Sequence, residues 1–268
     1  MKVLVSFPGR HGDILWALPT MRAISEYYQT PVDLLIAGEF AGLVSLLRLQ
    51  PYLGAVNADP TWGYVGPEHR IPYLGDREVD YSRIYHLGYR DWPKVPLPFD
   101  IWETAVAQGL SLEPIDLTRP WITVPGAWHP PAPLIVGFTD AWFELKLGLL
   151  ALVRHALPSL ECLQLTAPGS RWATEAPFGL VSVRPCAWEE AARTIRDAGV
   201  FFGDCAALHV LAVALGTSVF MVEPMEARWN PIFFPLGMAG RVKVIMGNDN
   251  RPTFDSRHTA DALREVLG

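Results

Sequence analysis

Two short segments of the chain place glycine, carboxylate and histidine residues where an apolar run ends and a helical pattern begins. One of them is Gly203-Asp204-Cys205-Ala206, which follows the strand-like Val200–Phe202, with His209 further along the helix. A helix N-terminus offers unbonded N–H groups and a positive dipole end, which together favour a diphosphate. A nucleotide-bearing ligand fits this chemistry. The structural alternatives are that Asp204 only caps the helix and that His209 is a core histidine.

The second segment is Pro8-Gly9-Arg10-His11-Gly12-Asp13, which follows the apolar run Val3–Phe7. Its glycines permit tight backbone geometry, and it supplies two potential cations, Arg10 and His11, beside the carboxylate of Asp13. This is the richest candidate site in the first half of the chain. Asp13 also has a structural alternative, because an aspartate before an apolar helix is a common N-cap.

The first half of the chain disfavours a nicotinamide cofactor. The glycine spacing near residue 9 is not G-x-G-x-x-G, and no acidic residue closes the second strand, which ends at Ala37-Gly38. A third segment, Glu223-Pro224-Met225-Glu226 with Pro231 beyond it, follows a later strand and is expected at the same site as Asp204. A proline-rich closing loop explains this segment equally well.

Hydrophobic periodicity predicts alternating strands and helices in the first half of the chain. A buried strand at Val3–Phe7 is followed by a helix from Asp13 to Tyr28, whose apolar residues recur at helical spacing. The other predicted elements are strands at Val32–Ala37, Ala55–Asn57 and Tyr81–Leu87 and helices at Glu39–Leu49 and Pro98–Gln108.

The second half repeats this alternation. The predicted strands are Leu134–Phe138, Leu160–Thr166, Leu180–Val183, Val200–Phe202, Ser218–Val222 and Val242–Met246. The predicted helices are Trp142–Ala156, Trp188–Asp197, Cys205–Leu215 and Thr259–Leu267, whereas Ala167–Gly179 is expected to be a brief connection without a helix. Alternation in both halves predicts an α/β protein with two parallel sheets flanked by helices.

The proline-rich segment Pro114–Pro133 is predicted to link an N-terminal domain, residues 1–127, to a C-terminal domain, residues 128–268. Ligands in such folds bind at the carboxyl ends of the strands. We therefore expect two Rossmann-like domains whose sheets face a central cleft, with the site in that cleft.

Composition narrows the class of protein. A net charge of −6 with 19% charged residues describes an ordinary soluble enzyme and disfavours a protein that coats a nucleic acid duplex. The three cysteines, odd in number and widely spaced, fit neither a disulfide framework nor a zinc knuckle. The longest apolar run, Leu208–Val222, is interrupted by His209 and by Gly216-Thr217-Ser218. We expect a cytoplasmic protein without a membrane span or a secretion signal.

The two segments and their order resemble the heptosyltransferase family of lipopolysaccharide synthesis. Gly12-Asp13 before Ile14-Leu15-Trp16-Ala17-Leu18-Pro19-Thr20 is similar to that family's opening, in which a Gly-Asp pair precedes an apolar helix containing Leu-Pro. Gly203 to His209, followed by an alanine-rich helix and Leu215-Gly216, resembles the family's Asp-Thr/Ser-Gly-x-x-His segment. Glu223-Pro224 and Pro231 resemble its Gly-Pro loop and a later proline.

This resemblance implies a GT-B glycosyltransferase that transfers a sugar from a nucleotide-sugar donor to an acceptor hydroxyl with inversion. Asp13 is then the general base, and Gly12, Arg10 and His11 lie around the acceptor. The residues implied at the donor are Asp204, Cys205, Ala206, His209 and Glu223, and Thr139 and Lys146 are further candidates there. The resemblance implies no metal or other cofactor. Such a transfer needs one carboxylate near the acceptor oxygen and N–H donors for the departing diphosphate.

The chain departs from the family pattern at two positions. Ala206 stands where the family has glycine, and Thr139-Asp140 occupies the strand end where the family has a basic residue, for which Lys146 and Arg171 are the candidates. Three alternatives therefore stay open. They are a non-catalytic nucleotide- or sugar-binding module, another enzyme on a similar fold such as a nucleotide-sugar epimerase, and a transferase acting on hydroxylated DNA bases.

Overall fold

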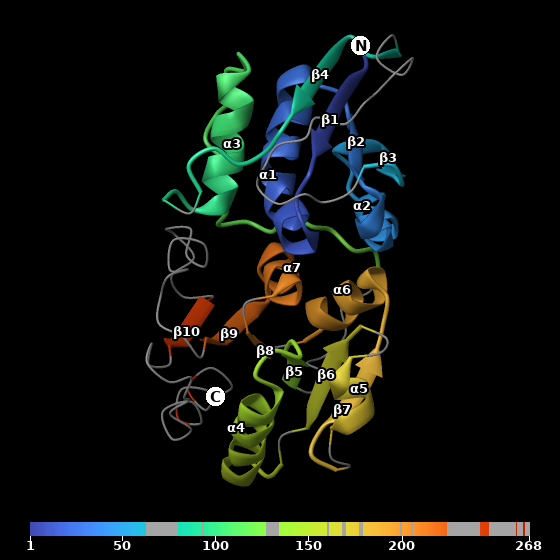
Figure 1. The fold of residues 1–268 in the computed structure, drawn as a ribbon. Coiled ribbons are helices and arrows are strands. Elements are labelled where there is room, and N and C mark those ends of the chain that lie inside the picture. The colour runs from blue at the N-terminus through green and yellow to red at the C-terminus, as the bar shows by residue number, and fades with distance from the viewer. Residues whose placement is uncertain are drawn as a thin grey trace. The chain divides into compact units, whose positions relative to one another are not determined.

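The computed structural model describes residues 1–62, 80–92, 94–126, 134–159, 161–167, 170–176, 179–198, 200–204, 206–223 and 242–246, together with Asp261 and Glu265. For Glu223 and for residues 242–246 it describes the backbone only. The chain divides into two compact units, the first formed by Met1–Pro125 and the second beginning at Gly126 (Figure 1).

The first unit is built on a parallel four-stranded sheet with strand order β3-β2-β1-β4. Every residue of β1 and β2 is buried, as expected for largely apolar strands in a parallel sheet covered on both faces. The strands are β1 (Val3–Phe7), β2 (Val32–Ala37), β3 (Leu53–Asp59) and β4 (Arg83–His86).

Helix α1 (His11–Tyr28) follows β1 and packs against α3 (Leu97–Ala107), beside which it lies in Figure 1. It begins at His11, two residues before the predicted start. The predicted helix at Glu39–Leu49 was wrong as a single element. The structure has a 3₁₀ helix, η1 (Gly38–Leu43), followed by the single turn α2 (Val44–Leu47). Glycines at positions 38 and 42 weaken an α-helix in this segment.

The first part of the predicted linker belongs to the core of the first unit. Trp121 is buried, and its Nε1–H donates to the Leu15 carbonyl of α1 at 3.0 Å. The Tyr52 hydroxyl donates to the Trp121 carbonyl at 2.5 Å, and the ring of Trp121 stacks on Trp16 with centroids 5.4 Å apart. Because Ile115, Leu117, Ile122 and Val124 are buried as well, Pro114–Pro125 packs as part of the first unit and not as the predicted linker between the units.

The second unit contains a parallel six-stranded sheet with order β10-β9-β8-β5-β6-β7. Numbered from its first strand, this is the 3-2-1-4-5-6 order of the doubly wound fold. Two parallel sheets confirm the predicted α/β class. The strands are β5 (Leu134–Gly137), β6 (Cys162–Thr166), β7 (Ser182–Pro185), β8 (Val200–Gly203), β9 (Ser218–Glu223) and β10 (Val242–Met246).

Helices bury both faces of this sheet. Phe202 of β8 shares a core with Phe143 of α4 and Trp172 of α5, whereas the neighbouring Phe201 lies beside Gly137, close to Leu208 of α7. The helices are α4 (Phe143–Ala156), α5 (Arg171–Glu175), α6 (Trp188–Arg196) and α7 (Ala207–Leu215).

Helix α5 corrects the expectation that Ala167–Gly179 connects two strands without a helix. Its five residues are too few to show a helical period in the sequence. The predicted closing helix lies outside the described residues except for Asp261 and Glu265. Within the described part of the chain, no helix combines the length and apolar character needed to cross a membrane.

Two glycines let β5 and β8 approach closely where both strands end. Gly137 and Gly203 are partners in the register of these strands. A Cβ atom on Gly203 would lie 2.8 Å from the Gly137 carbonyl oxygen, and one on Gly137 would lie 2.2 Å from Cζ of Phe201. Larger residues would therefore spread the strand ends that carry the second candidate segment.

We expect Gly203→Ala to destabilise the second unit by about 1–3 kcal/mol, because the new methyl group meets backbone rather than a flexible side chain. Gly148→Ala is the matched control, since its Cβ meets nothing within 4 Å in α4, and it should stabilise by roughly 0.5–1 kcal/mol. Urea unfolding of the three proteins measures both changes. Equal stability of Gly203→Ala and the parent would show that the strand ends separate without cost.

Candidate functional site

Both candidate segments lie where the strand order of a sheet reverses. In the first unit the order reverses between β1 and β4, and in the second between β5 and β8. The loops that follow such a pair of strands diverge, which leaves the carboxyl ends of the strands open to a ligand. We call the contact between Asp13 and Tyr89 the Asp13 site and the group Thr139, Lys146 and Asp204 the Asp204 cluster.

The Asp13 carboxylate is held through one of its two oxygens. Oδ2 accepts a hydrogen bond from the Arg10 amide at 3.1 Å and another from the Tyr89 hydroxyl at 2.6 Å. Asp13 is the third residue of α1, whose N-cap is Arg10, so the interpretation of Asp13 as the N-cap was wrong. Its bond to the Arg10 amide is the side-chain-to-backbone half of a capping box, which gives the residue a structural role as well.

Burial changes the acidity of this carboxyl group. Asp13 is half-buried, and the loss of solvent raises its pKa above the ordinary value. The hydrogen bonds from Tyr89 and the Arg10 amide and the charge of Arg10 oppose this effect without cancelling it. A carboxylate with a raised pKa is a stronger base than an ordinary aspartate, as proton abstraction from a hydroxyl requires.

The residues predicted around the acceptor adjoin Asp13 along the chain. Arg10 is exposed and Gly12 is half-buried in the first turn of α1. His11 sits edge-on to the ring of Phe40, with centroids 4.8 Å apart. Burial lowers the pKa of His11, against the opposing charge of Glu39. The structure thus groups these residues, and their contacts to an acceptor stay a prediction.

Tyr89 is a site residue that the sequence analysis missed. It follows β4 by three residues, and β4 lies beside β1, so the two loops leave the same edge of the sheet. A tyrosine just after a strand was the available signal. It could not be used, because strand order is not visible in the periodicity of the sequence.

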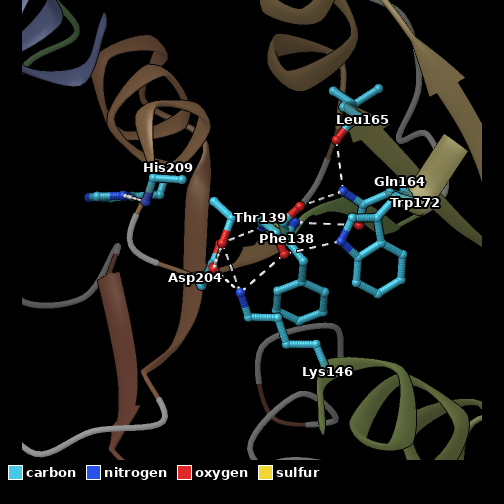
Figure 2. A network of polar contacts seen from close by, with 9 residues as sticks. Phe138, Thr139, Lys146, Gln164, Leu165, Trp172, Asp204 and His209 are labelled. Carbon is cyan, nitrogen blue, oxygen red and sulfur yellow. Dashed lines mark hydrogen bonds and ion pairs between the residues drawn. The ribbon is translucent and has the colours of Figure 1, made fainter. Parts of the chain in front are cut away.

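The Asp204 cluster brings together three residues predicted at the donor (Figure 2). Asp204 follows β8, and its Oδ1 accepts from the Thr139 amide at 3.1 Å while Oδ2 accepts from the Thr139 hydroxyl at 2.5 Å. Lys146 reaches from α4 to form an ion pair with Asp204 Oδ2. Its Nζ also donates to the Thr139 hydroxyl oxygen at 2.9 Å and to the Thr139 carbonyl at 3.2 Å.

This ion pair is withdrawn from solvent. Lys146 is 0% exposed and Asp204 is 5% exposed. A buried pair is tolerated only when hydrogen bonds satisfy both partners, and Thr139 supplies them here. In this conformation the ammonium and carboxylate groups engage each other and Thr139, and together they fix the loop that follows β5. Their contacts to a donor stay a prediction.

Two more side chains hold the end of β5, and the sequence analysis missed both (Figure 2). Trp172 Nε1–H donates to the Thr139 carbonyl at 3.1 Å. The amide of Gln164 donates to the Phe138 carbonyl at 3.1 Å and to the Leu165 carbonyl at 2.8 Å. A single glutamine inside the apolar run of β6 was a usable signal, because a buried amide needs partners.

His209 is buried in the first turn of α7, and its Nδ1 accepts from the Ala206 amide at 3.0 Å. Burial lowers the pKa of His209 to about 4, against the Ala206 bond and the charge of Asp204. The ring is therefore neutral near pH 7, with its proton assigned to Nε2. Because Ala206 is the N-cap of α7, the interpretation of Asp204 as that cap was wrong.

Two predicted donor residues cannot be placed with the others. Cys205 and the side chain of Glu223 lie outside the described residues, although Glu223 closes β9 as expected. Of the other carboxylates, Asp91, Asp100 and Glu103 lie within 4.8 Å of one another. Asp100 uses both oxygens to bind the amides of Arg90 and Asp91, at 3.0 and 2.7 Å, so we assign it to anchoring that loop.

Comparison with known proteins gives a fold. No protein-family model and no curated protein matches the sequence. The structure is similar to ADP-heptose lps heptosyltransferase II of E. coli, with a TM-score of 0.66 and 15% identity over 100% of this chain and 98% of that chain. It is also similar to a family 9 glycosyl transferase from Veillonella parvula DSM 2008, with a TM-score of 0.65 and 10% identity over 100% and 90% of the two chains.

A putative UDP-N-acetylglucosamine 2-epimerase from Listeria monocytogenes shares the fold as well, with a TM-score of 0.52 and 12% identity over 99% of this chain and 88% of that chain. The resemblance to heptosyltransferases is thus confirmed as a similarity of fold over the whole chain. At these identities the similarity shows the fold, and it does not by itself establish either activity for this chain.

We expect Lys146→Met to destabilise the second unit by about 3–5 kcal/mol, because it leaves the Asp204 carboxylate buried without its counter-charge. The double variant Lys146→Met with Asp204→Asn should lose less than the sum of the single changes. Arg193→Met, which breaks the ion pair of an exposed arginine with the half-buried Glu189, is the control and should cost less than about 1 kcal/mol. Denaturant unfolding of the two single variants, Lys146→Met and Asp204→Asn, of the double variant and of Arg193→Met measures these changes. A Lys146→Met loss as small as the control would mean that water reaches the cluster.

Proposed function

We propose that this chain is an inverting glycosyltransferase of the GT-B architecture that transfers a sugar from a nucleotide-sugar donor to an acceptor hydroxyl. Residues 1–127 would bind the acceptor and residues 128–268 the donor. One observation carries the proposal: at the reversal point of the first sheet, the Asp13 carboxylate is oriented through Oδ2 and has a raised pKa. The similarity of the whole chain to sugar transferases supports the reaction class.

In the proposed reaction Asp13 takes the proton of the acceptor hydroxyl as that oxygen attacks the anomeric carbon of the donor. The new C–O bond forms on the face of the anomeric carbon opposite its bond to the diphosphate. That bond breaks, and the nucleoside diphosphate leaves with the electron pair. The configuration at the anomeric carbon therefore inverts. Negative charge therefore grows on the departing diphosphate, and N–H donors placed there lower the barrier. The chemistry needs no redox step, and we expect no metal cofactor.

The N-terminus of α7 is the proposed diphosphate site. The first amides of a helix have no partner within the helix, and its dipole favours an anion. Ala206, Cys205 and His209 would lie around the diphosphate, with Glu223 at the end of β9 nearby in the sheet. Thr139, Lys146 and Asp204 hold the end of β5 in place, which would support the donor rather than neutralise its charge, because Lys146 is already paired.

A nucleotide-sugar epimerase is the second candidate, favoured by the fold similarity to the putative 2-epimerase. The two functions differ in what they need. An epimerase converts a nucleotide sugar without an acceptor, whereas a transferase leaves the sugar configuration at C2 unchanged and releases a nucleoside diphosphate. Incubation with a bound nucleotide sugar in the absence of any acceptor, followed by NMR of the sugar, separates them.

We expect a nucleoside diphosphate, or its sugar conjugate, to raise the thermal unfolding temperature of the protein. A ligand at about 100 times its dissociation constant stabilises the folded state by roughly 2.7 kcal/mol. A panel of nucleoside diphosphates and nucleotide sugars, with nucleoside monophosphates as the control, identifies the donor class. If a well-folded sample responds to none of them, the donor assignment at Asp204, Ala206 and His209 is withdrawn.

We expect Asp13→Asn to abolish transfer while leaving the dissociation constant of the donor within a few-fold of the parent value. The amide oxygen can still accept from Arg10 and Tyr89, and burial disfavours the charged form of Asp13, so the variant should be no less stable at neutral pH. Asp116→Asn, at an exposed loop carboxylate, is the control. Release of nucleoside diphosphate with an acceptor panel measures turnover, and unchanged turnover in Asp13→Asn removes the base assignment.

A further inference from the structure

The two oxygens of the Asp13 carboxylate are not equivalent. Both hydrogen bonds that reach the group, from the Arg10 amide and the Tyr89 hydroxyl, end on Oδ2. Within the described part of the chain, no hydrogen bond reaches Oδ1. A carboxylate held in this way presents one fixed oxygen and one oxygen with both lone pairs available to a new partner.

Tyr89 is held on its ring and on its backbone. Its ring packs against Phe7 of β1 and against Trp92, with centroids 5.8 and 6.2 Å away. The backbone amides on either side of it are bound by side chains of α3. Gly88 N–H donates to the Thr104 hydroxyl at 3.3 Å. Asp100 accepts from the amides of Arg90 and Asp91, the two residues after Tyr89.

Helix α3 therefore fixes both partners of the contact. It anchors the Tyr89 loop through Thr104 and through Asp100, which is 0% exposed, and it packs against α1, the helix that carries Asp13. Asp13 lies on α1, and α3 anchors the loop that carries Tyr89, so the packed pair of helices places both groups. Such a shell around a reactive group is what preorganisation requires.

We propose that Tyr89 is a positioning residue for Asp13: its hydroxyl holds Oδ2 and orients the carboxylate so that Oδ1 takes the proton of the acceptor. This inference rests on the proposed function, in which Asp13 is the base. Tyr89 itself exchanges no proton with the substrate. Its hydroxyl stays a donor to Oδ2 throughout, and the proton from the acceptor arrives on the opposite oxygen.

Among the residues that the structure describes, Arg10 is the charged residue that acts on the Asp13 carboxylate. His11, in the same turn, faces Phe40 and Glu39, and burial favours its neutral form. On the Tyr89 loop, Arg90 and Asp91 form an ion pair at 3.5 Å. Removal of the Tyr89 hydroxyl takes away its hydrogen bond to Asp13 and leaves these charged groups in place.

Tyr89→Phe tests the inference, because it keeps the ring contacts and deletes only the hydroxyl. In the parent protein the hydrogen bond from Tyr89 favours the ionised form of Asp13. Loss of this bond should therefore raise the pKa of Asp13 further. Protein labelled with ¹³C at the aspartate carboxyl carbons reports this titration by NMR, and the resonance missing from Asp13→Asn assigns it. This readout needs neither donor nor acceptor.

In the transfer assay, the acid limb of kcat/KM for the acceptor should move to higher pH in Tyr89→Phe. At a fixed pH below the pKa of Asp13, kcat/KM of Tyr89→Phe should then be about tenfold lower than that of the parent for each unit by which the pKa rises. Tyr81→Phe is the matched control, since Tyr81 donates to Asp33 at 3.1 Å in the same unit and lies outside the Asp13 site. Its limb should coincide with that of the parent.

The outcomes separate the inference from the proposed function. An unchanged Asp13 titration in Tyr89→Phe, or a shifted titration that the pH profile does not follow, overturns the positioning role. A shifted titration together with full transfer by Asp13→Asn overturns the base assignment instead, and the positioning role falls with it. Coincident movement of titration and profile, absent from Tyr81→Phe, supports the inference.

Substitution of Tyr89 by 3-fluorotyrosine keeps the test available should the phenylalanine variant fail to fold. Fluorine makes the phenol a stronger acid and a stronger hydrogen-bond donor while preserving its shape. The Asp13 titration and the acid limb should then move to lower pH, opposite to the effect of phenylalanine. Movement in the same direction as phenylalanine, or none, would contradict the inference.

Discussion

The reversal of strand order in each parallel sheet is the constraint on which both candidate sites depend. Right-handed crossovers place helices on one face while the chain builds away from its first strand, and on the other face when it returns to build on the opposite side. The loops after β1 and β4, and those after β5 and β8, therefore diverge. Asp13 and Tyr89 meet at the first of these points, and Thr139 and Asp204 meet at the second.

The carboxylates at the two reversal points differ in their hydrogen bonds and counter-charges. This difference indicates a structural role for Asp204 and a chemical role for Asp13. Asp204 has a counter-charge, Lys146, and accepts two further bonds from Thr139, so its charge is balanced and its position is fixed. Among the described residues, Asp13 accepts from an amide and a neutral hydroxyl, and the charge of Arg10 is the smallest of the effects on its pKa. A partly buried carboxylate without an ion-pair partner gains stability by accepting a proton, which is the property of a base.

The sequence predicted the bounds of the strands best where a largely apolar run is flanked by proline or glycine. Val3–Phe7, Val32–Ala37 and Val242–Met246 have the predicted bounds. It failed where structure depends on distant contacts. The segment Pro114–Pro125 has the composition of a linker, yet Trp121 docks it onto α1. Likewise Lys146 was identified as a candidate, but its burial depends on which face of α4 meets the sheet. The pairing of Tyr89 with Asp13 depends on strand order, which no local pattern encodes.

The ionisation that would make Asp13 reactive also acts against the fold. Because burial raises the pKa of Asp13 in the folded protein above its unfolded value, the contribution of this group to stability is fully present below the unfolded pKa. It is lost as the pH rises through the folded pKa, where the base forms. Activity and stability therefore respond in opposite directions to the same proton. The Tyr89 hydroxyl reduces this loss of stability, because its hydrogen bond favours the ionised carboxylate. Asp100 in turn holds the loop that carries Tyr89. A site that removed the conflict entirely, as the Lys146 pair does for Asp204, would have no reason to take a proton from a hydroxyl.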